Sequence, residues 1–223
     1  MRFDVVTLFP EMFHGVCSES ILKRAQDRFL IEIHFTQLRD FAFDKHRQVD
    51  DTPFGGGAGM VLKPEPMYRA VRSIPRRNHS RLIILDPAGE KFSQHKAKSL
   101  ASLDQLILIA GHYEGFDARI YELADELISL GDFILTGGEL AAMVIIDAAA
   151  RMIPGVLGDE TSAITDSFYD GKFLESPQYT RPRNFEGMIV PEILLSGNHA
   201  KIDEWRKIQT LKRTQKFRPD LLE

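Results

Sequence analysis

Asp166 is the first residue of this sequence to consider for chemistry, because it lies in a stretch rich in glycine, serine, threonine and aspartate. A carboxylate on such a segment can act as a general base when the segment closes over a substrate. It can also be a solvated side chain of a linker. Arg151 follows an alanine-rich apolar stretch, where a guanidinium can interact with a helix C-terminus, hold a substrate oxygen or orient a carboxylate. Proton transfer with charge stabilisation is therefore one interpretation of these residues.

A second feature is the glycine turn Thr136-Gly137-Gly138, which separates the end of an apolar strand from an apolar helix that begins at Glu139. Backbone N–H groups at a helix N-terminus have no partner within the helix and can bind the polar edge of a ligand. The helix is rich in alanine, which lets another backbone approach closely. The sequence thus predicts a ligand-binding turn joined to a closely packed helix.

A third feature is the loop at residues 52–60, which has four glycines in five consecutive positions. Glycine permits positive φ and close approach of the backbone, at an entropic cost. Such a loop can close over a flat base or cradle a phosphate; the alternative is a flexible connector. The mixed-charge segment 44–51 directly before the loop favours the functional interpretation, since it places polar side chains beside the glycines.

These groups need a scaffold, and the pattern of apolar runs predicts one. We expect strands at residues 3–8, 31–35, 81–85, 105–110 and 126–130, and helices at residues 64–77, 93–103 and 139–153. Alternating strands and helices indicate an α/β fold with a mostly parallel sheet and helices on both faces. Ligands bind at the carboxyl ends of the strands in such sheets. Here those ends lead into glycine-containing segments at residues 86–89, 111–115 and 131–138, so we expect a site there.

The composition excludes several other classes of protein. With 43% hydrophobic and 27% charged residues among 223, the chain can bury a substantial core. The single cysteine, Cys17, excludes an internal disulfide and a cysteine-rich zinc site, as is typical of a reducing compartment. The histidines are scattered, without an H-E-x-x-H motif, so we expect no metal site. Neither G-x-G-x-x-G after a strand nor a P-loop occurs. No signal peptide or membrane span is visible, so we expect a cytoplasmic protein without a membrane partner.

The character of the chain changes after Pro154. Residues 155–177 are poor in apolar positions and are typical of a linker. A helical segment follows, with Gly197 ending one short helix and Asn198 capping the next. Residues 200–218 carry seven basic and two acidic side chains. This concentration of positive charge indicates a polyanion partner, with a solvated helix face as the alternative.

Seven motifs follow one another along the chain: FDVVTLFPEMF, HRQVDDTPFGGGAGM, GHYEGFDAR, GDFILTGGELAAM, ARMIPGVLG, SPQYTRP and LLSGNHAKIDEWR. In their residues and in their order they closely resemble the bacterial tRNA (guanine-N1)-methyltransferases, from Met1 to Glu223. The resemblance implies transfer of a methyl group from S-adenosylmethionine to N1 of the tRNA guanine that lies 3′ of the anticodon. The product would be N1-methylguanosine at position 37 of the tRNA.

The same resemblance implies an architecture. It predicts a SPOUT methyltransferase domain with a deep trefoil knot over residues 1–160, a flexible linker over 161–176, and a small all-α tRNA-binding domain over 177–223. A deep knot departs from the usual topological rules, so only the resemblance suggests it. The family further implies an obligate homodimer with an active site shared between subunits. We place the alanine-rich helix at the dimer interface.

Residue roles follow from the resemblance position by position. Asp166 matches the general base and Arg151 the arginine needed for catalysis. The predicted cofactor-binding residues are Leu85, Pro87, Gly111, Tyr113, Glu114, Leu130, Gly131, Asp132, Phe133, Ile134, Leu135, Gly137, Gly138 and Ala141. The predicted substrate-binding residues are His46, Asp50, Phe54, Gly55, Gly56, Gly57 and Gly59. The resemblance also implies a need for Mg²⁺, with Glu114 as a contact to consider.

The sequence departs from the family pattern at two cofactor-loop positions. His112 stands where arginine is common, and Ala141 where proline is common. Two other functions stay open from the residues alone. One is a related knotted methyltransferase that modifies another RNA nucleotide, such as a ribose 2′-OH, and the other is a catalytically silent RNA-binding module. Asp166 separates them, because neither alternative needs that carboxylate together with three glycine-bearing loops.

Overall fold

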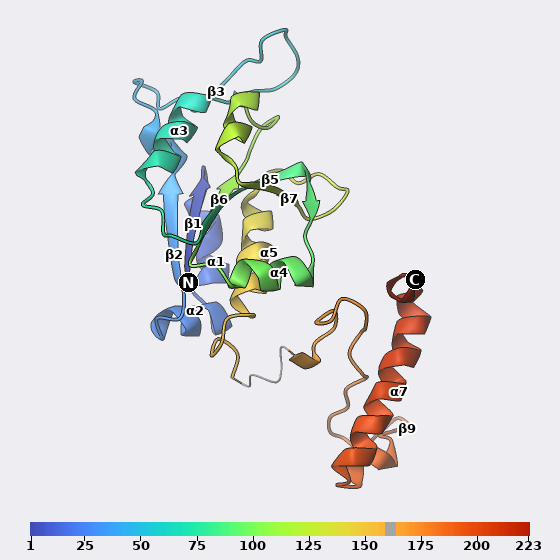
Figure 1. Ribbon diagram of the computed structural model, residues 1–223. Coiled ribbons are helices and arrows are strands. Elements are labelled where there is room, and N and C mark those ends of the chain that lie inside the picture. Colours follow the sequence, from blue (N-terminus) through green and yellow to red (C-terminus); the bar gives the residue numbers. More distant parts are fainter. Residues whose placement is uncertain (159–163) are drawn as a thin grey trace. The chain divides into compact units, whose positions relative to one another are not determined.

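The computed structural model describes residues 1–158 and 164–223 and divides the chain into two compact units (Figure 1). The first unit is Met1–Gly158 and the second is Asp159–Glu223. The expected domain boundary at residue 160 and the first residues of the expected linker, 161–163, lie outside the described residues.

A five-stranded sheet forms the centre of the first unit, and all of its neighbouring strands are parallel. Its order is β2-β1-β6-β5-β7. The strands are β1 (Arg2–Thr7), β2 (Glu32–Gln37), β5 (Ser80–Lys91), β6 (Gln105–Ala110) and β7 (Glu126–Ser129). All five predicted strands are therefore present, and the predicted parallel pairing is confirmed. A separate two-stranded ribbon pairs β3 (Asp50–Asp51) with β4 (Val61–Leu62).

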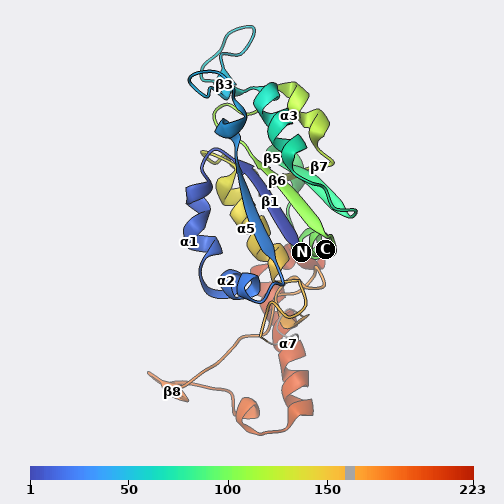
Figure 2. The same ribbon diagram turned by 90° about the vertical axis from the view of Figure 1, so that its left-hand side faces the viewer.

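Helices cover both faces of this sheet, as the sequence predicts (Figure 2). The central strand β6 is buried at all six positions because its side chains alternate between two cores. One core contains Leu106 and Leu108 and is closed by α1 (His14–Cys17), α2 (Ser20–Asp27), α4 (Gln94–Ala101) and α5 (Glu139–Ala150). The other contains Ile107 and Ile109 and is closed mainly by α3 (Pro64–Ser73) and by the 3₁₀ helices η2 (Leu38–Phe41) and η3 (Ala118–Leu123). One more 3₁₀ helix, η1 (Pro10–Phe13), precedes α1.

Local signals explain where these helices begin and end. The Ser93 hydroxyl caps α4 by accepting a hydrogen bond from the Lys96 N–H. Helix α3 ends at Ser73, four residues before the prediction, because Pro75 disfavours helical geometry at the residue before it. Helix α5 ends at Ala150 rather than at residue 153, and turns follow it.

Strand β5 differs most from its prediction, since it extends from Ser80 to Lys91 instead of ending at residue 85. The strand bulges on its way past β7, so that Ile128 pairs with both Leu85 and Glu90. Gly89 lies inside this bulge, where a Cβ atom would be 2.4 Å from the backbone nitrogen of Ile128. The glycine thus permits the close approach, and the loop after residue 85 stays attached to the sheet.

The alanines of α5 have a different role from the expected one. Ala141, Ala142, Ala149 and Ala150 are buried in the core of the first unit, where α5 packs against α4 and β6. They therefore serve packing within the unit and carry no argument for a dimer interface. The exposed positions of the helix include Leu140 and Val144, which are 48% and 47% exposed.

The second unit consists of α7 (His199–Phe217), the 3₁₀ helices η4 (Glu192–Leu195) and η5 (Pro219–Leu222), and the hairpin β8 (Asn184–Phe185) and β9 (Met188–Ile189). The hairpin means that the expectation of an all-α unit is wrong in detail. Asn198 caps α7 through the Lys201 N–H, and Gly197 has a φ of +70°, both as predicted.

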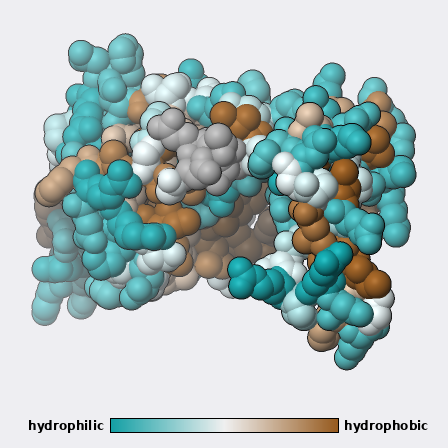
Figure 3. Space-filling view, turned by 90° about the horizontal axis from the view of Figure 1, so that it is seen from below, coloured by the Kyte–Doolittle hydropathy of each residue, from teal (hydrophilic) through white to brown (hydrophobic). Residues whose placement is uncertain are grey.

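The described part of the expected linker, residues 164–176, belongs to this second unit. The Leu174 N–H donates to the Thr214 hydroxyl, and the Arg213 guanidinium donates to the Glu175 carbonyl oxygen. These bonds attach the segment to α7. Hydrophobic residues also lie at the surface of this unit, as Figure 3 shows; the exposed side chains of α7 include Ile208 and Leu211. No helix within the described residues is both long and apolar enough to cross a bilayer.

Candidate cofactor site

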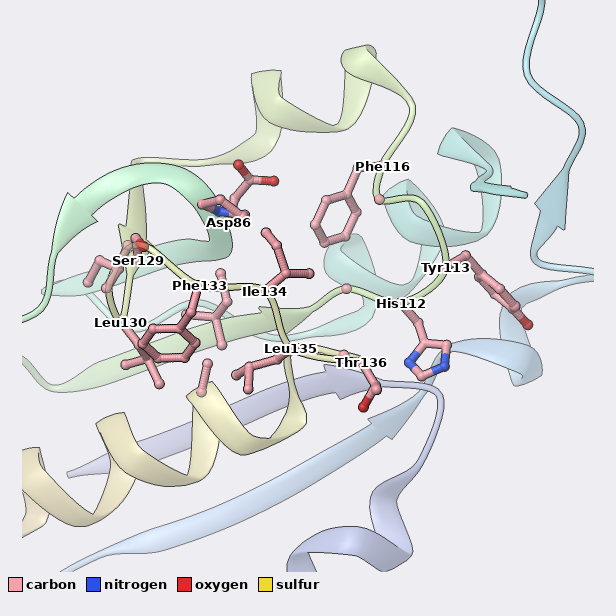
Figure 4. A pocket seen from close by; sticks show the side chains of 18 of the residues that line it. Asp86, His112, Tyr113, Phe116, Ser129, Leu130, Phe133, Ile134, Leu135 and Thr136 are labelled. Carbon is pink, nitrogen blue, oxygen red and sulfur yellow. The ribbon is translucent and has the colours of Figure 1, made fainter. Parts of the chain in front are cut away.

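A cavity of about 390 Å³ opens at the carboxyl ends of β6 and β7 and beside the bulge of β5 (Figure 4). All three glycine-containing segments that the sequence predicts at strand ends contribute to its lining, although residues 86–89 lie within β5 rather than after it. Its lining comprises Leu85, Asp86, Pro87, Gly111, His112, Tyr113, Glu114, Gly115, Phe116, Ile128, Ser129, Leu130, Gly131, Phe133, Ile134, Leu135, Thr136, Gly137, Gly138 and Ala141. The volume falls within the range of about 300–1,000 Å³ that small-molecule sites occupy.

Thirteen of the fourteen predicted cofactor-binding residues line this cavity. The exception is Asp132, whose carboxylate forms an ion pair with Lys91 at 2.6 Å and is 81% exposed. Its neighbours in sequence, Gly131 and Phe133, do line the cavity, so the loop passes the site while this one side chain turns to solvent. The resemblance assigns the whole loop by position and does not distinguish its inward from its outward side chains.

Close backbone contact holds two of the loops together. The Gly138 N–H donates to the Gly111 carbonyl oxygen at 2.8 Å, and His112 forms a backbone bridge with Gly137. A Cβ atom on Gly138 would be 2.8 Å from both the Ala110 Cα and the Gly111 nitrogen. No side chain fits there, so glycine is required by the close approach of the two loops.

The walls of the cavity are largely apolar. Phe116 forms one side, and a Cβ atom on Gly111 would be 2.6 Å from its ring. Figure 4 shows Phe133, Ile134 and Leu135 following one another along the opposite loop. Ile134 is 80% exposed, although it belongs to a cavity wall. Apolar walls with backbone polar groups at the loops suit a ligand that has a flat ring and polar edges.

Asp86 lines the cavity and belongs to the predicted segment 86–89, but it is not among the predicted cofactor-binding residues. Its carboxylate accepts hydrogen bonds from the Tyr121 hydroxyl at 2.6 Å and from the Ala88 N–H at 2.9 Å. Burial of the ring, and then the bond to Asp86, raise the pKa of Tyr121, so its proton stays on the phenol. The signal that indicates Asp86 is its place directly after the buried residues 82–85 of β5, next to the predicted Pro87.

The glycine-rich loop lies between β3 and β4 and does not line the cavity. All four predicted glycines have positive φ, and Phe54 at the start of the loop is fully exposed. The base of the loop contacts the cavity rim, because the Glu114 N–H donates to the Met60 carbonyl oxygen at 3.0 Å. A Cβ atom on Gly59 would be 2.5 Å from the Glu114 side chain. The loop is therefore attached to the site.

The other two predicted substrate residues, His46 and Asp50, come directly before the glycine-rich loop in the chain. Asp50 is half-buried in β3, and His46 is exposed in the turn before it. The backbone N–H of His46 donates to the Asp44 carboxylate at 2.9 Å, and those of Gln48 and Asp44 interact with that carboxylate as well. These bonds fix the turn and leave the His46 ring to other contacts.

The two predicted catalytic residues belong to different units. Arg151 in the first unit is half-buried and directly follows α5, where its N–H donates to the Asp147 carbonyl oxygen at 3.2 Å. Asp166 in the second unit is half-buried in a turn that follows the helical residues Ile164 and Thr165. The turn is held by a hydrogen bond from the Glu175 N–H to the Ser167 hydroxyl at 3.0 Å. Asp166 is thus part of a formed turn.

The tRNA (guanine-1)-methyltransferase TrmD family matches the chain over residues 1–223. The chain belongs to this family. It is 58% identical to the tRNA (guanine-N(1)-)-methyltransferase of Carboxydothermus hydrogenoformans over 100% of the chain and 87% of that protein. It is 57% identical to the protein of the same name from Staphylococcus carnosus, over 100% of the chain and 91% of the relative. A third such protein, from Desulfitobacterium hafniense, is 58% identical over 99% of the chain and 84% of its own length.

Membership of the methyltransferase family indicates what the cavity is for. A methyltransferase must bind a methyl donor, and the predicted cofactor-binding residues line this cavity. The described residues contain no group of three or more histidine, cysteine, aspartate or glutamate side chains arranged to hold a metal ion.

Proposed function

We propose that this chain transfers a methyl group from S-adenosylmethionine to N1 of the guanine immediately 3′ of the anticodon in tRNA. Family membership supports methylation of tRNA guanine at N1. The observation that carries the proposed cofactor is the cavity, in which the bulge of β5 and the loops after β6 and β7 bring thirteen of fourteen predicted residues together.

The residues present fit the proposed cofactor. The apolar walls around Phe116 and Leu135 suit an adenine ring, and the backbone of Gly111, Gly137 and Gly138 suits its polar edges. When bound, S-adenosylmethionine supplies an electrophilic methyl group on a sulfonium. The residues of the chain then have a positioning task, because in-line transfer requires the two substrates to be held at reacting distance.

Asp166 is the proposed general base. Guanine N1 carries a proton at neutral pH and is a poor nucleophile until that proton is removed. A positioned carboxylate takes the proton and contributes about 10²–10⁴-fold in rate. Asp166 is supported by its match to the family motif and by its place in a formed turn.

Arg151 is proposed to stabilise the negative charge that develops on the guanine when its N1 proton is removed. Removal of the N1 proton moves negative charge toward O6 of the guanine, and a guanidinium stabilises that oxygen. Arg151 is supported by its match to the family motif, and it directly follows α5.

The tRNA is proposed to contact both units. The target guanine must be turned out of the anticodon loop to enter a pocket. The exposed Phe54 and the glycines that follow it are proposed to lie against the nucleotide from the rim of the cavity. The basic residues of α7 are proposed to bind tRNA phosphates, for which their charge is suited.

Two features of architecture belong to the proposal. The first is the deep trefoil knot, which is supported by the family resemblance alone. The second is a homodimer in which Asp166 of one protomer serves the cofactor cavity of the other. Its support is an exposed apolar surface of four side chains on α5 and the η1–α1 segment that packs against it: Leu140, Val144, Met12 and Val16.

Mg²⁺, which the resemblance implies, has no protein site among the described residues. Glu114 stands at the cavity rim as a single carboxylate. Mg²⁺ is commonly held by one or two carboxylates together with waters and phosphates, so these residues alone do not form its site. No step of the proposed reaction is assigned to it.

Two alternatives differ from the proposal in their need for Asp166. A knotted enzyme that methylates a ribose 2′-OH needs different groups to activate the hydroxyl. A silent RNA-binding module needs neither the carboxylate nor the cavity. The cavity argues against the second alternative, and the family match argues against both.

The experiment that tests the base assignment compares the Asp166→Ala and Asp166→Asn variants with the unmodified chain. We expect the single-turnover rate of methyl transfer to fall by about 10²–10⁴-fold in both, because each lacks the carboxylate that accepts the N1 proton. The dissociation constants for the cofactor and for tRNA should stay within about threefold of the original values. Near-full activity of either variant would refute the assignment.

A further inference from the structure

Glu139 is a buried carboxylate that the proposed reaction does not use. It is the first residue of α5, directly after the Gly137–Gly138 turn, and it is only 1% exposed. Burial of a carboxylate costs free energy unless its oxygens have partners. The contacts of the two oxygens therefore indicate why this residue is placed behind the cavity.

One oxygen has a fixed partner on the sheet. The Thr7 hydroxyl, at the end of β1, donates to Glu139 Oε1 at 2.8 Å. The same hydroxyl oxygen accepts a hydrogen bond from the Phe9 N–H at 2.9 Å. Because a hydroxyl has one proton, these two bonds fix its direction and attach the start of α5 to β1.

The other oxygen faces His112 across a gap. Glu139 Oε2 lies 3.9 Å from His112 Nδ1, which is too far for a hydrogen bond. His112 Nδ1 is the buried side-chain polar atom that has no hydrogen-bond partner among the described residues. Buried polar atoms without a partner are rare in folded proteins and call for an explanation. Here a suitable acceptor stands about 1 Å beyond bonding distance.

Both sides of this gap belong to the cavity loops. His112 and Gly137 line the cavity and form a backbone bridge with each other. A Cβ atom on Gly137 would be 2.3 Å from Glu139 Oε2 and 2.6 Å from His112 Nδ1, so glycine keeps the path between them open. Figure 4 shows the His112 ring at one end of the cavity, near Thr136.

We propose that Glu139 is a positioning residue for cofactor binding, which draws His112 and the 111–115 loop onto the ligand. In the occupied state His112 Nδ1–H donates to Glu139 Oε2, and the loop that carries Tyr113 and Glu114 closes the cavity. The Phe9 and Tyr113 rings, whose centroids are 5.0 and 5.2 Å from that of His112, guide the imidazole along this path. The inference rests on the proposed cofactor.

The test is a double-mutant cycle of Glu139→Leu and His112→Phe in the full chain, with S-adenosylmethionine binding measured by calorimetry. Both single variants lose the contact between His112 and Glu139, so we expect each to weaken cofactor affinity by at least about tenfold; Glu139→Leu also loses the bond to Thr7. The double variant should bind no more weakly than Glu139→Leu alone, because the contact with His112 can be lost only once. The KM for tRNA should stay within about twofold in all three variants.

Two further variants separate positioning from general stability. Glu139→Gln keeps an acceptor oxygen for Thr7, and its amide N–H can donate to His112 Nδ1 when the imidazole adopts its other neutral tautomer. It should therefore bind the cofactor within about threefold of the original affinity. Asp4→Asn changes another carboxylate that is 1% exposed, which contacts Gln105 and Arg2 and lies outside the cavity. It should lower the melting temperature and leave cofactor affinity unchanged.

The outcomes distinguish this inference from the proposed function. If the unmodified chain does not bind S-adenosylmethionine, the proposed function fails and the inference fails with it. If the unmodified chain binds and Glu139→Leu binds equally well, only the inference is overturned. It is also overturned if the losses of the two single variants multiply in the double variant. If Glu139→Leu fails to fold, the cofactor affinities of His112→Phe and Glu139→Gln test the inference without it. A loss of about tenfold in the first and of less than about threefold in the second supports the inference, and unchanged affinity in His112→Phe overturns it.

Discussion

At the scale of the residue, Gly138 shows how one missing side chain permits the site. Its nitrogen bonds to the neighbouring cavity loop, and its hydrogen atoms occupy space where a methyl group would meet backbone. Backbone cannot move aside as the end of a flexible side chain can. The two loops must therefore separate if any other residue stands at this position.

We expect Gly138→Ala to weaken cofactor binding by about 10- to 100-fold, since a displacement of about 1 Å in a positioned site has effects of this size. It should also lower the free energy of unfolding by about 1–3 kcal/mol, as overpacking does. Calorimetry and thermal unfolding measure the two effects. The control is Gly158→Ala, where no atom lies within 4 Å of the added methyl group. Unchanged affinity in Gly138→Ala would contradict the close-approach argument.

Asp166 and Arg151 mark the limit of prediction at this scale. Their residue types indicate proton transfer and charge stabilisation, but a single sequence leaves a solvated aspartate and a helix-end arginine equally open. The structure adds that each is half-buried in a formed local environment. Their assignment as a catalytic pair still depends on the family resemblance, because they belong to separate units.

At the scale of the element, Asp125 attaches β5 to the segment before β7. Its carboxylate accepts from the Leu82 N–H at 2.7 Å and from the Arg76 guanidinium at 2.6 Å. Partial burial alone raises the pKa of this carboxyl, but the two hydrogen bonds outweigh burial, and the pKa lies below its ordinary value of 3.8. A lowered pKa in the folded state stabilises the fold only while the group is charged.

Asp125→Asn should therefore reduce the free energy of unfolding at pH 7 by about 1 kcal/mol, a modest value because solvent screens the pair with Arg76. The stabilisation is fully present above the unfolded pKa of 3.8 and is lost as the pH falls through the lower folded pKa. Urea unfolding at pH 7 and near pH 3 measures this difference. A difference between the two proteins that grows toward pH 3 would contradict a lowered pKa of Asp125 in the folded state.

The sequence predicts which strands and helices form better than it predicts what their residues contact. The apolar runs predict all five parallel strands, most clearly the central ones, because buried strands must be apolar on both faces, as residues 106–109 of β6 are. The edge strand β2 has no buried position. The rule that ligands bind at carboxyl ends then places the cavity correctly. The bulge of β5 was not predictable, because it depends on the contact of Gly89 with a strand 39 positions later, at Ile128. The alanines of α5 were misinterpreted, because composition does not tell which neighbour a small residue faces.

At the scale of the whole molecule, the proposed homodimer now depends on exposed apolar side chains rather than on alanines. Leu140 and Val144 are four residues apart on α5 and therefore lie on one face of the helix. Met12 and Val16 lie on the η1–α1 segment, which packs against α5 through η1, and they are 46% and 44% exposed. Exposed apolar side chains on neighbouring elements favour a protein interface.

We expect Leu140→Glu combined with Val144→Glu to produce monomers and to abolish methyl transfer, because the proposed active site needs Asp166 from the partner. Sedimentation velocity and an activity assay measure the two effects. Phe29→Glu is the matched control, since Phe29 is 90% exposed and lies outside this surface; it should stay dimeric and active. An active monomer, in the double variant or in the unmodified chain, would reject the shared site.

The central claim is that methyl groups pass from S-adenosylmethionine to N1 of the guanine 3′ of the anticodon. The most direct measurement incubates the chain with methyl-labelled cofactor and an unmodified tRNA transcript, followed by nucleoside analysis. A second transcript differs only in having adenine at the target position. The account predicts about one labelled N1-methylguanosine per tRNA for the first transcript and none for the second. Label in a ribose 2′-O-methyl group, at another nucleotide, or equally in both transcripts would contradict it.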